Sequence, residues 1–227
     1  MKQRIIVAID GPAGAGKSTI ARAVAAALGS VYIDTGAMYR AVAVRGVHES
    51  ADPGDEERMT AIASAAEIEL APEGRVLLDG EDVSAGIRTP EIAQLASKVS
   101  ALPGVRRAMV ALQRKMAESV PVVMEGRDIG TVVFPNAQVK IFLDATPEVR
   151  AARRVRDMRE RGIEADPAQV AAEIRERDHR DRNRAEAPLT QAADAVYLDS
   201  SGMTIDQVVE AVLSIADGKA LKGSLEK

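Results

Sequence analysis

The stretch RIIVAIDGPAGAGKST, residues 4–19, decides the fold predicted for this chain. It begins with a short apolar run, residues 4–9, that indicates a buried strand. The residues from Gly11 to Ser18 then match the pattern G-x-x-x-x-G-K-[S/T] without a gap, and a helical pattern starts at Ser18. A strand, a glycine-rich loop and a helix in this order are typical of phosphate-binding loops, or P-loops.

The chemistry of such a loop explains its residues. Glycines let successive backbone N–H groups converge on phosphate oxygens, and the start of the helix adds positive potential. Lys17 would reach the β- and γ-phosphates of ATP, and the hydroxyl of Ser18 would bind Mg²⁺. We therefore predict that ATP binds through Gly11, Pro12, Ala13, Gly14, Ala15, Gly16, Lys17, Ser18 and Thr19.

Because GTPases, helicases and small kinases share this loop, it does not identify the reaction. The guanine-reading motif N-K-x-D is absent, which argues against a GTPase.

Composition narrows the classes further. The chain has 227 residues, of which 46% are hydrophobic and 2% aromatic, and its net charge is −4. We expect one domain with a small insert. So few aromatic residues argue against a platform for single-stranded nucleic acid, and the net charge gives no general attraction to DNA or membranes. With no cysteine, disulfides and thiolate metal sites are excluded. We expect a cytoplasmic monomer without nucleic-acid or membrane partners.

Four further apolar runs resemble the first one, at residues 31–33, 122–124, 139–143 and 195–198. Helical patterns separate them, including residues 18–28, 36–47, 105–116, a segment that starts at Thr146-Pro147, one near Asp166-Pro167, and residues 204–216. Short apolar runs that alternate with helices indicate strands buried on both faces of a parallel sheet. The predicted fold class is therefore α/β, with three layers and a five-stranded parallel sheet.

Residues 67–83 break this alternation and predict a β-hairpin around a Pro-Glu-Gly turn. We assign residues 60–92 to an insert. Residues 1–59 and 93–227 then form the P-loop core, with a lid at about 150–165.

Arginine is concentrated in the second half of the chain. Residues 150–184 contain eleven arginines and no lysine. A solvated helical face of mixed charge is the alternative interpretation. Arginine, however, presents a planar fork that matches phosphate and stays charged when water is excluded. We predict that lid arginines, among them Arg153 and Arg156, contact ATP.

Several longer motifs together resemble the bacterial cytidylate kinases, within the nucleoside monophosphate kinase family. They are IDGPAGAGKST (9–19), DTGAMYRAVA (34–43), DGEDVSAGIRT (79–89), EGRDIGTVVFP (125–135), KIFLDA (140–145) and ERDHRDRNRAEAPL (176–189). They span nearly the whole chain in the family's order. The resemblance implies a P-loop kinase fold in which the insert at residues 60–92 binds the nucleoside monophosphate acceptor. It also implies transfer of the γ-phosphate of ATP to CMP or dCMP, in pyrimidine nucleotide metabolism, with Mg²⁺ as cofactor.

The resemblance also implies roles for individual residues. Lys17, Arg127, Arg177 and Arg184 would be catalytic. The CMP site would consist of Thr35, Tyr39, Arg40, Ser97, Arg106, Arg127, Asp128, Arg177, Asp181 and Arg184. Ser97, Arg106 and Asp128 match base-contact positions, and Asp181 would orient Arg177 or bind the ribose. Glu125, where some members have Asp, would help to organise Mg²⁺ through water.

Two alternatives stay open at this point. One is a kinase for another acceptor, such as UMP, AMP or a metabolite alcohol. The other is an ATP-dependent switch that binds nucleic acid.

Overall fold

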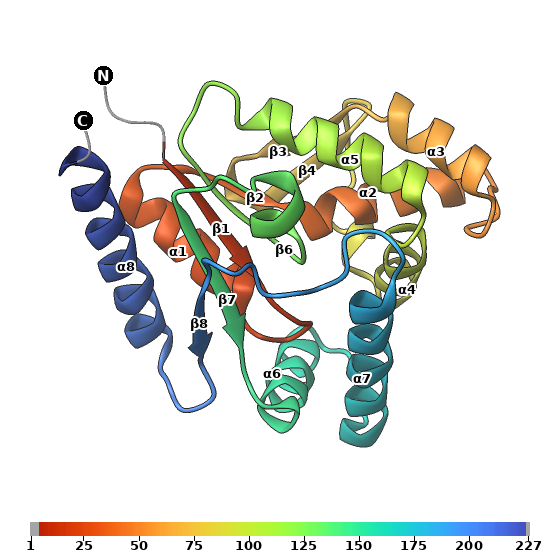
Figure 1. The fold of residues 1–227 in the computed structure, drawn as a ribbon. Coiled ribbons are helices and arrows are strands. Elements are labelled where there is room, and N and C mark those ends of the chain that lie inside the picture. The colour runs from red at the N-terminus through yellow and green to blue at the C-terminus, as the bar shows by residue number, and fades with distance from the viewer. Residues whose placement is uncertain (1–4, 226–227) are drawn as a thin grey trace. The chain divides into compact units, whose positions relative to one another are not determined.

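The computed structural model describes residues 5–225, with side chains through residue 218, and contains a five-stranded sheet in the order β2-β6-β1-β7-β8 (Figure 1). The strands are β1 (Ile6–Asp10), β2 (Val31–Asp34), β6 (Val122–Gly126), β7 (Val139–Asp144) and β8 (Val196–Asp199). β1 pairs in parallel with β6 and β7, and β7 pairs in parallel with β8. The five predicted strands and the α/β class are confirmed. Arg4, which was predicted to begin the first strand, lies outside the described residues.

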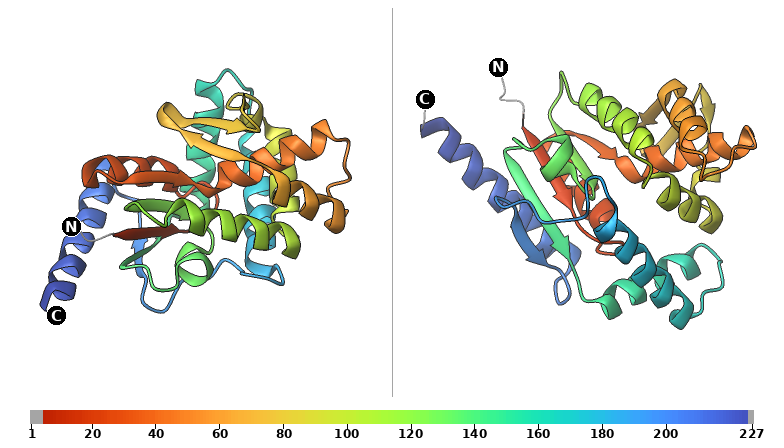
Figure 2. Two further views of the ribbon diagram at one scale, coloured as in Figure 1. Left: turned by 90° about the horizontal axis from the view of Figure 1, so that it is seen from above. Right: turned by 45° about the vertical axis from the view of Figure 1, so that its right-hand side comes forward.

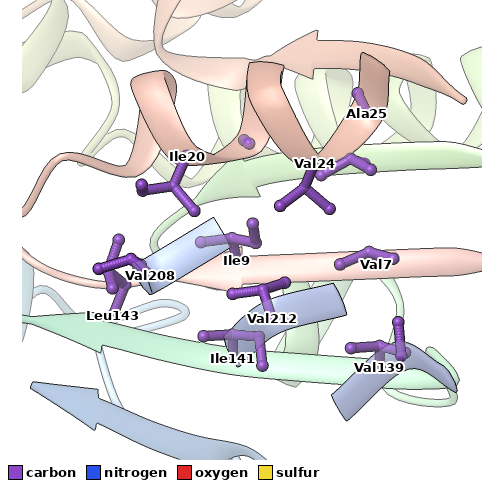
Figure 3. Packing of buried hydrophobic residues seen from close by; sticks show 13 residues of the cluster. Val7, Ile9, Ile20, Val24, Ala25, Val139, Ile141, Leu143, Val208 and Val212 are labelled. Atoms are coloured by element: carbon purple, nitrogen blue, oxygen red, sulfur yellow. The ribbon is translucent and has the colours of Figure 1, made fainter. Parts of the chain in front are cut away.

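The core on one face of this sheet lies between the strands and two helices, α1 (Lys17–Leu28) and α8 (Ile205–Leu225) (Figure 3). Val7 and Ile9 of β1 alternate with residues that point to the other face, as the pleat of a strand requires. Ile20 and Val24, one helical turn apart on α1, cover them. Fully burying each such side chain contributes about 1.5–3 kcal/mol. This packing fixes the strand and the helix that flank the glycine-rich loop.

Two helices follow β7: α6 (Pro147–Glu160) and α7 (Pro167–Asn183), which lie side by side (Figures 1 and 2). Each begins where the sequence predicts. Thr146 and Asp166 cap them through their side chains, and proline occupies the first turn of both. Their apolar residues Ala151, Val155, Val170 and Ile174 form a separate buried cluster, so the pair is held together by its own small core.

The chain divides into two compact units. The first comprises the described residues up to Tyr32 and from Ser119 onward, and the second is Ile33–Glu118. The second unit contains α2 (Thr35–His48), α3 (Glu56–Ala65), α4 (Pro90–Val99) and α5 (Pro103–Met116). It also holds an antiparallel sheet of β3 (Ile68–Ala71), β4 (Arg75–Leu78) and β5 (Glu81–Asp82), seen in Figure 2. The insert predicted at residues 60–92 lies inside this unit.

Some elements differ from the sequence prediction. The predicted hairpin is present, and β5 adds a third strand through the turn at Asp79 and Gly80, both at positive φ. The π-helix η3 (Ile129–Val133) was not predicted, and neither were α3 and α4. The last helix continues to Leu225 instead of ending near residue 216. No helix within residues 5–225 is both long enough and apolar enough to cross a membrane.

Candidate active site

The glycine-rich loop between β1 and α1 depends on backbone conformations that glycine adopts. Gly14 and Gly16 have positive φ values of 77° and 91°, and Gly16 caps α1 in the left-handed region. At Gly11 the constraint is space, because a Cβ atom there would lie 1.9 Å from the carbonyl oxygen of Leu143 in β7. The loop is thus packed directly against the end of a neighbouring strand.

Lys17 is the first residue of α1 and is buried. Its Nζ donates to the carbonyl oxygen of Pro12 at 2.7 Å, so the side chain folds back over the loop. Burial, and next the positive charge of Arg127, lower the pKa of Lys17 to about 7. A bound polyphosphate would supply the negative charge that this ammonium group needs. Ser18 is partly exposed in the same helical turn, and Thr19 is exposed.

The opposite side of the loop rests on residues from the second half of the chain. The peptide groups of Ala13 contact Arg150 and Asp178, both buried. Arg153 donates to the carbonyl oxygens of Ala15, at 3.3 Å, and of Ser200, at 2.7 Å. Of the two arginines predicted to contact ATP, Arg153 therefore lies beside the loop, and Arg156 is exposed to solvent.

Three charged residues lie at the end of the buried strand β6 and directly after it. Glu125, within β6, is buried and accepts a hydrogen bond from the Tyr32 hydroxyl at 2.9 Å. Arg127 donates through Nε to Oδ2 of Asp181 on α7 at 2.8 Å. Burial alone would raise the pKa of Asp181, but Arg127 and Arg177 outweigh it, and the pKa lies below its usual value. Asp181 therefore stays ionised: it accepts a hydrogen bond from Arg127, and the charge of its predicted neighbour Arg177 also lowers its pKa.

Asp128, the second residue after β6, is buried at the start of η3, and Nη2 of Arg184 lies 3.6 Å from its Oδ1. Arg184 also donates through Nε to the carbonyl oxygen of Ala187 at 2.6 Å. The charge of Arg177 acts on both Lys17 and Asp181. Within the first unit, the structure thus brings together six of the predicted residues: Lys17, Arg127, Asp128, Arg177, Asp181 and Arg184.

Asp10, at the carboxyl end of β1, was not predicted as a site residue. Its carboxylate accepts the backbone N–H groups of Ile129 at 2.8 Å and Gly130 at 2.7 Å. Burial raises the pKa of Asp10 to about 6, although these two bonds oppose the shift. The side chain fixes the first turn of η3 and with it the position of Asp128. An acid at the end of a strand was the only signal in the sequence.

The second unit holds the other predicted acceptor residues: Thr35, Tyr39 and Arg40 on α2, Ser97 on α4, and Arg106 on α5. Arg106 is buried, like Val105 and Met109 of the same helix. Its Nη1 donates to the carbonyl oxygen of Ser100 at 3.1 Å, and its guanidinium lies 5.8 Å from the centre of the Tyr39 ring. The hydroxyl oxygen of Ser97 is buried without a hydrogen-bond partner, so it can still bind a ligand.

Two residues of the first unit, Ser18 and Glu125, carry side-chain oxygen atoms of the type that binds Mg²⁺. Within residues 5–225 no group of three or more His, Cys, Asp or Glu side chains is arranged to hold a metal by itself. Mg²⁺ commonly uses one or two protein oxygens together with substrate phosphates and water. The hydroxyl of Ser18 and the carboxylate of Glu125, which acts electrostatically on Lys17, are compatible with that kind of binding.

Comparison with known proteins adds an independent line of evidence. The family model described as cytidylate kinase matches residues 7–218. A cytidylate kinase of Solibacter usitatus is 56% identical over 98% of this chain and 96% of the relative. One of Syntrophotalea carbinolica is 49% identical over 95% and 93%. Among solved structures, a gluconokinase from Sinorhizobium meliloti covers 100% of both chains with a TM-score of 0.52 and 15% identity, a likeness of fold alone.

Proposed function

This chain belongs to the cytidylate kinase family, and we propose from that membership that it transfers the γ-phosphoryl group of ATP to CMP and dCMP, giving ADP with CDP or dCDP. The family recognised from the sequence motifs is confirmed. The observation that best supports the activity in this structure is the gathering of Arg127, Arg177 and Asp181 around the buried Lys17. A phosphate loop next to several paired arginines suits transfer between two phosphates.

On the donor side, backbone N–H groups of the loop and the ammonium group of Lys17 bind the phosphates of ATP. Mg²⁺, held by Ser18 and through water by Glu125, would neutralise charge on the β- and γ-phosphates. The Tyr32 hydroxyl fixes one oxygen of Glu125 and so limits the positions that this carboxylate adopts. The loop and Lys17 thereby orient the γ-phosphorus toward the acceptor.

On the acceptor side, Arg127, Arg177 and Arg184 bind the phosphate of CMP. No strong general base is required, because a phosphate monoester oxygen is already ionised near neutral pH. Asp181 and Asp128 lie next to two of these arginines and keep their forks oriented when the acceptor is absent. The catalytic contribution of the protein is then positioning and the stabilisation of developing negative charge.

Recognition of the base rests on the resemblance and on the second unit. The buried, unpartnered hydroxyl of Ser97 and the buried guanidinium of Arg106 match the need for hydrogen-bonding groups that face cytosine. Asp128 is the proposed acceptor for the cytosine amine. Uracil reverses part of the donor and acceptor pattern, so it would leave buried groups unpaired, at a cost on the order of 10⁴-fold in selectivity. Thr35, Tyr39 and Arg40 are proposed contacts to the acceptor, and we propose that the enzyme acts as a cytoplasmic monomer.

The test is ADP release with Mg·ATP across AMP, GMP, CMP, dCMP, UMP and dTMP, repeated with Arg106→Ala and Asp128→Ala. Arg107→Ala is the matched control, because Arg107 is the exposed neighbour on the same helix. We expect CMP and dCMP to dominate, with the preference lost in the two site variants and kept in the control. Preference for another monophosphate would show the base assignment to be wrong, and no turnover of any monophosphate would refute the kinase activity itself.

A further inference from the structure

A buried ion pair beneath the phosphate loop has no part in the function described above. Arg150, in the first turn of α6, and Asp178, on α7, are each 4% exposed. Nη1 of Arg150 donates to Oδ2 of Asp178 at 2.6 Å. Burying two such charges requires further hydrogen bonds that satisfy their remaining donors and acceptors, and most of these are made with the loop.

Both side chains bind the same loop residue, Ala13. Its N–H donates to Oδ1 of Asp178 at 3.2 Å, and its carbonyl oxygen accepts from Nη1 of Arg150 at 2.9 Å. With the ion pair itself, these bonds close a ring through Ala13, Arg150 and Asp178. Nε of Arg150 donates in addition to the carbonyl oxygen of Ala145 at 3.0 Å, which fixes the plane of the guanidinium against the chain that leaves β7.

This ring sets the direction of the peptide group that follows Ala13. The described residues contain no cis peptide bond, and in a trans peptide the C=O and the next N–H point in opposite directions. Because the Ala13 carbonyl points at Arg150, the N–H of Gly14 points away from it. Gly14 also packs closely against α6, since a Cβ atom placed there would lie 3.0 Å from the carbonyl oxygen of Arg150. The Ala13 N–H is occupied by Asp178, so the amides available for a phosphate begin at Gly14.

The ring also has an electrostatic consequence. A carboxylate directly under an anion-binding loop would oppose the binding of a polyphosphate. Arg150 cancels that charge and keeps the hydrogen-bonding geometry of Asp178. Because α6 and α7 share their own apolar cluster, the ring connects the loop to the two helices as one packed body.

We propose that Arg150 and Asp178 are positioning residues that hold the phosphate loop in its ATP-binding conformation and tie it to α6 and α7. The effect on turnover depends on the function proposed above, whereas the effect on ATP binding does not. Neither residue needs to touch ATP for this role.

The decisive variants are Arg150→Lys and Asp178→Glu, which keep both charges and change only the geometry of the ring. Lysine lacks the planar fork that reaches Ala145, Ala13 and Asp178 together. Titration calorimetry with ATP should show a Kd that rises on the order of tenfold in each variant. The double variant should lose little more than the larger single effect, because both changes break the same ring. Arg175→Lys and Glu173→Gln, at exposed positions of α7, serve as controls and should bind ATP like the wild type.

Two kinetic patterns distinguish a positioning role from a role in packing alone. If the ring positions the loop, the KM for CMP should stay within about twofold of wild type while the Kd for ATP rises. Folded variants that bind ATP with unchanged Kd would overturn the proposal. Equal increases in the Kd for ATP and the KM for CMP, accompanied by a lower Tm, would indicate a role in packing alone and would overturn the proposal as well. If Asp178→Glu does not fold, Arg150→Lys decides. If the wild type turns over no monophosphate, the proposed function fails, but ATP titration still tests the ring.

Discussion

Arg127 and Asp181 form a 2.8 Å hydrogen-bonded ion pair that joins the loop after β6 to the end of α7, and both side chains are largely buried. The pair fixes one of the arginines proposed to bind phosphate from the helix that carries another, Arg177. Asp181 is ionised there, with its pKa below the usual value, because the charges of Arg127 and Arg177 outweigh its burial. The carboxylate thus interacts electrostatically with arginines on two elements.

Replacing Asp181 tests this arrangement. Asp181→Asn keeps the size of the side chain but removes the charge, so Arg127 loses a charge-assisted bond worth roughly 1.5–3 kcal/mol. We expect kcat/KM for CMP to fall about tenfold to a hundredfold. Asp217→Asn, an exposed acid on α8, is the control. Steady-state kinetics with unchanged kcat/KM in Asp181→Asn would contradict the positioning of Arg127 by this residue.

The ring of Tyr39 should support Arg106 in the second unit. Tyr39→Leu removes the aromatic face beneath the guanidinium, a contact worth roughly 0.5–2 kcal/mol. We expect the KM for CMP to rise about threefold to thirtyfold while the KM for ATP stays constant. Tyr39→Phe keeps the ring and removes only the hydroxyl, so it distinguishes the contributions of the two groups. If Phe and Leu raise the KM for CMP equally, the hydroxyl matters and the stacking on Arg106 does not.

The pKa of Asp10 predicts a specific dependence of stability on pH. Between the ordinary pKa of 3.8 and the folded-state value of about 6, the folded chain binds a proton that the unfolded chain has released. The contribution of this group therefore falls as pH rises through that window, by roughly 3 kcal/mol in total. In Asp10→Asn this dependence should disappear. Urea unfolding at intervals from pH 4 to 7 measures it, and parallel curves for the two proteins would show that Asp10 does not titrate there.

Lys17 should take up a proton when ATP binds. With a pKa of about 7, it is mostly neutral at pH 8, and phosphates placed next to it favour the ammonium form. Calorimetric titration with ATP at pH 8, in buffers of different ionisation enthalpy, should therefore show net proton uptake. At pH 6 the lysine is already protonated, and the uptake by this group should be small. No uptake at pH 8 would mean that Lys17 is charged before ATP arrives.

Gly11 and Gly29 are constrained for different reasons: a Cβ atom has no space at Gly11, whereas Gly29 has open space but a positive φ. Gly11→Ala places a methyl group 1.9 Å from a backbone oxygen of β7, so the loop or the strand must move. We expect a loss of at least about 3 kcal/mol in the free energy of unfolding and weaker ATP binding. Gly29→Ala, with φ of 61° and open space around it, should cost only about 1–2 kcal/mol and leave ATP binding unchanged. Equal losses from the two variants in thermal unfolding would contradict this reasoning.

The sequence was most informative where a structure depends on neighbouring residues. The phosphate loop, the short β-branched strands and the capped starts of α6 and α7 all follow from patterns of a few residues. The contacts of Asp10 with Ile129 and of Asp178 with Ala13 do not, because they join positions 119 and 165 residues apart. Periodicity along a helix says which residues share a face, but only packing decides which face is buried.

The arginines of α6 illustrate the same limit. In the sequence Arg150, Arg153 and Arg156 are equivalent members of one run. In the structure the first is buried beneath the loop, the second is half-buried beside it and the third is exposed. Arg106 is a further example, because this charged residue is buried and lies against the ring of Tyr39. The charge of a residue therefore did not predict whether it is buried, either among the arginines of α6 or at Arg106.

The central place of β1 has a consequence for how the protein is made. The strand lies between β6 and β7, whose residues are synthesised more than 110 positions later, and the loop after it is held by Asp178 and Ser200. At roughly 5–20 residues per second, the ribosome needs about ten seconds or more to supply these partners. Until then the first strand and its glycine-rich loop have no sheet to join. The part of the chain that is translated first is among the last to reach its final conformation, and a nascent chain shorter than about 200 residues lacks the scaffold of its nucleotide site.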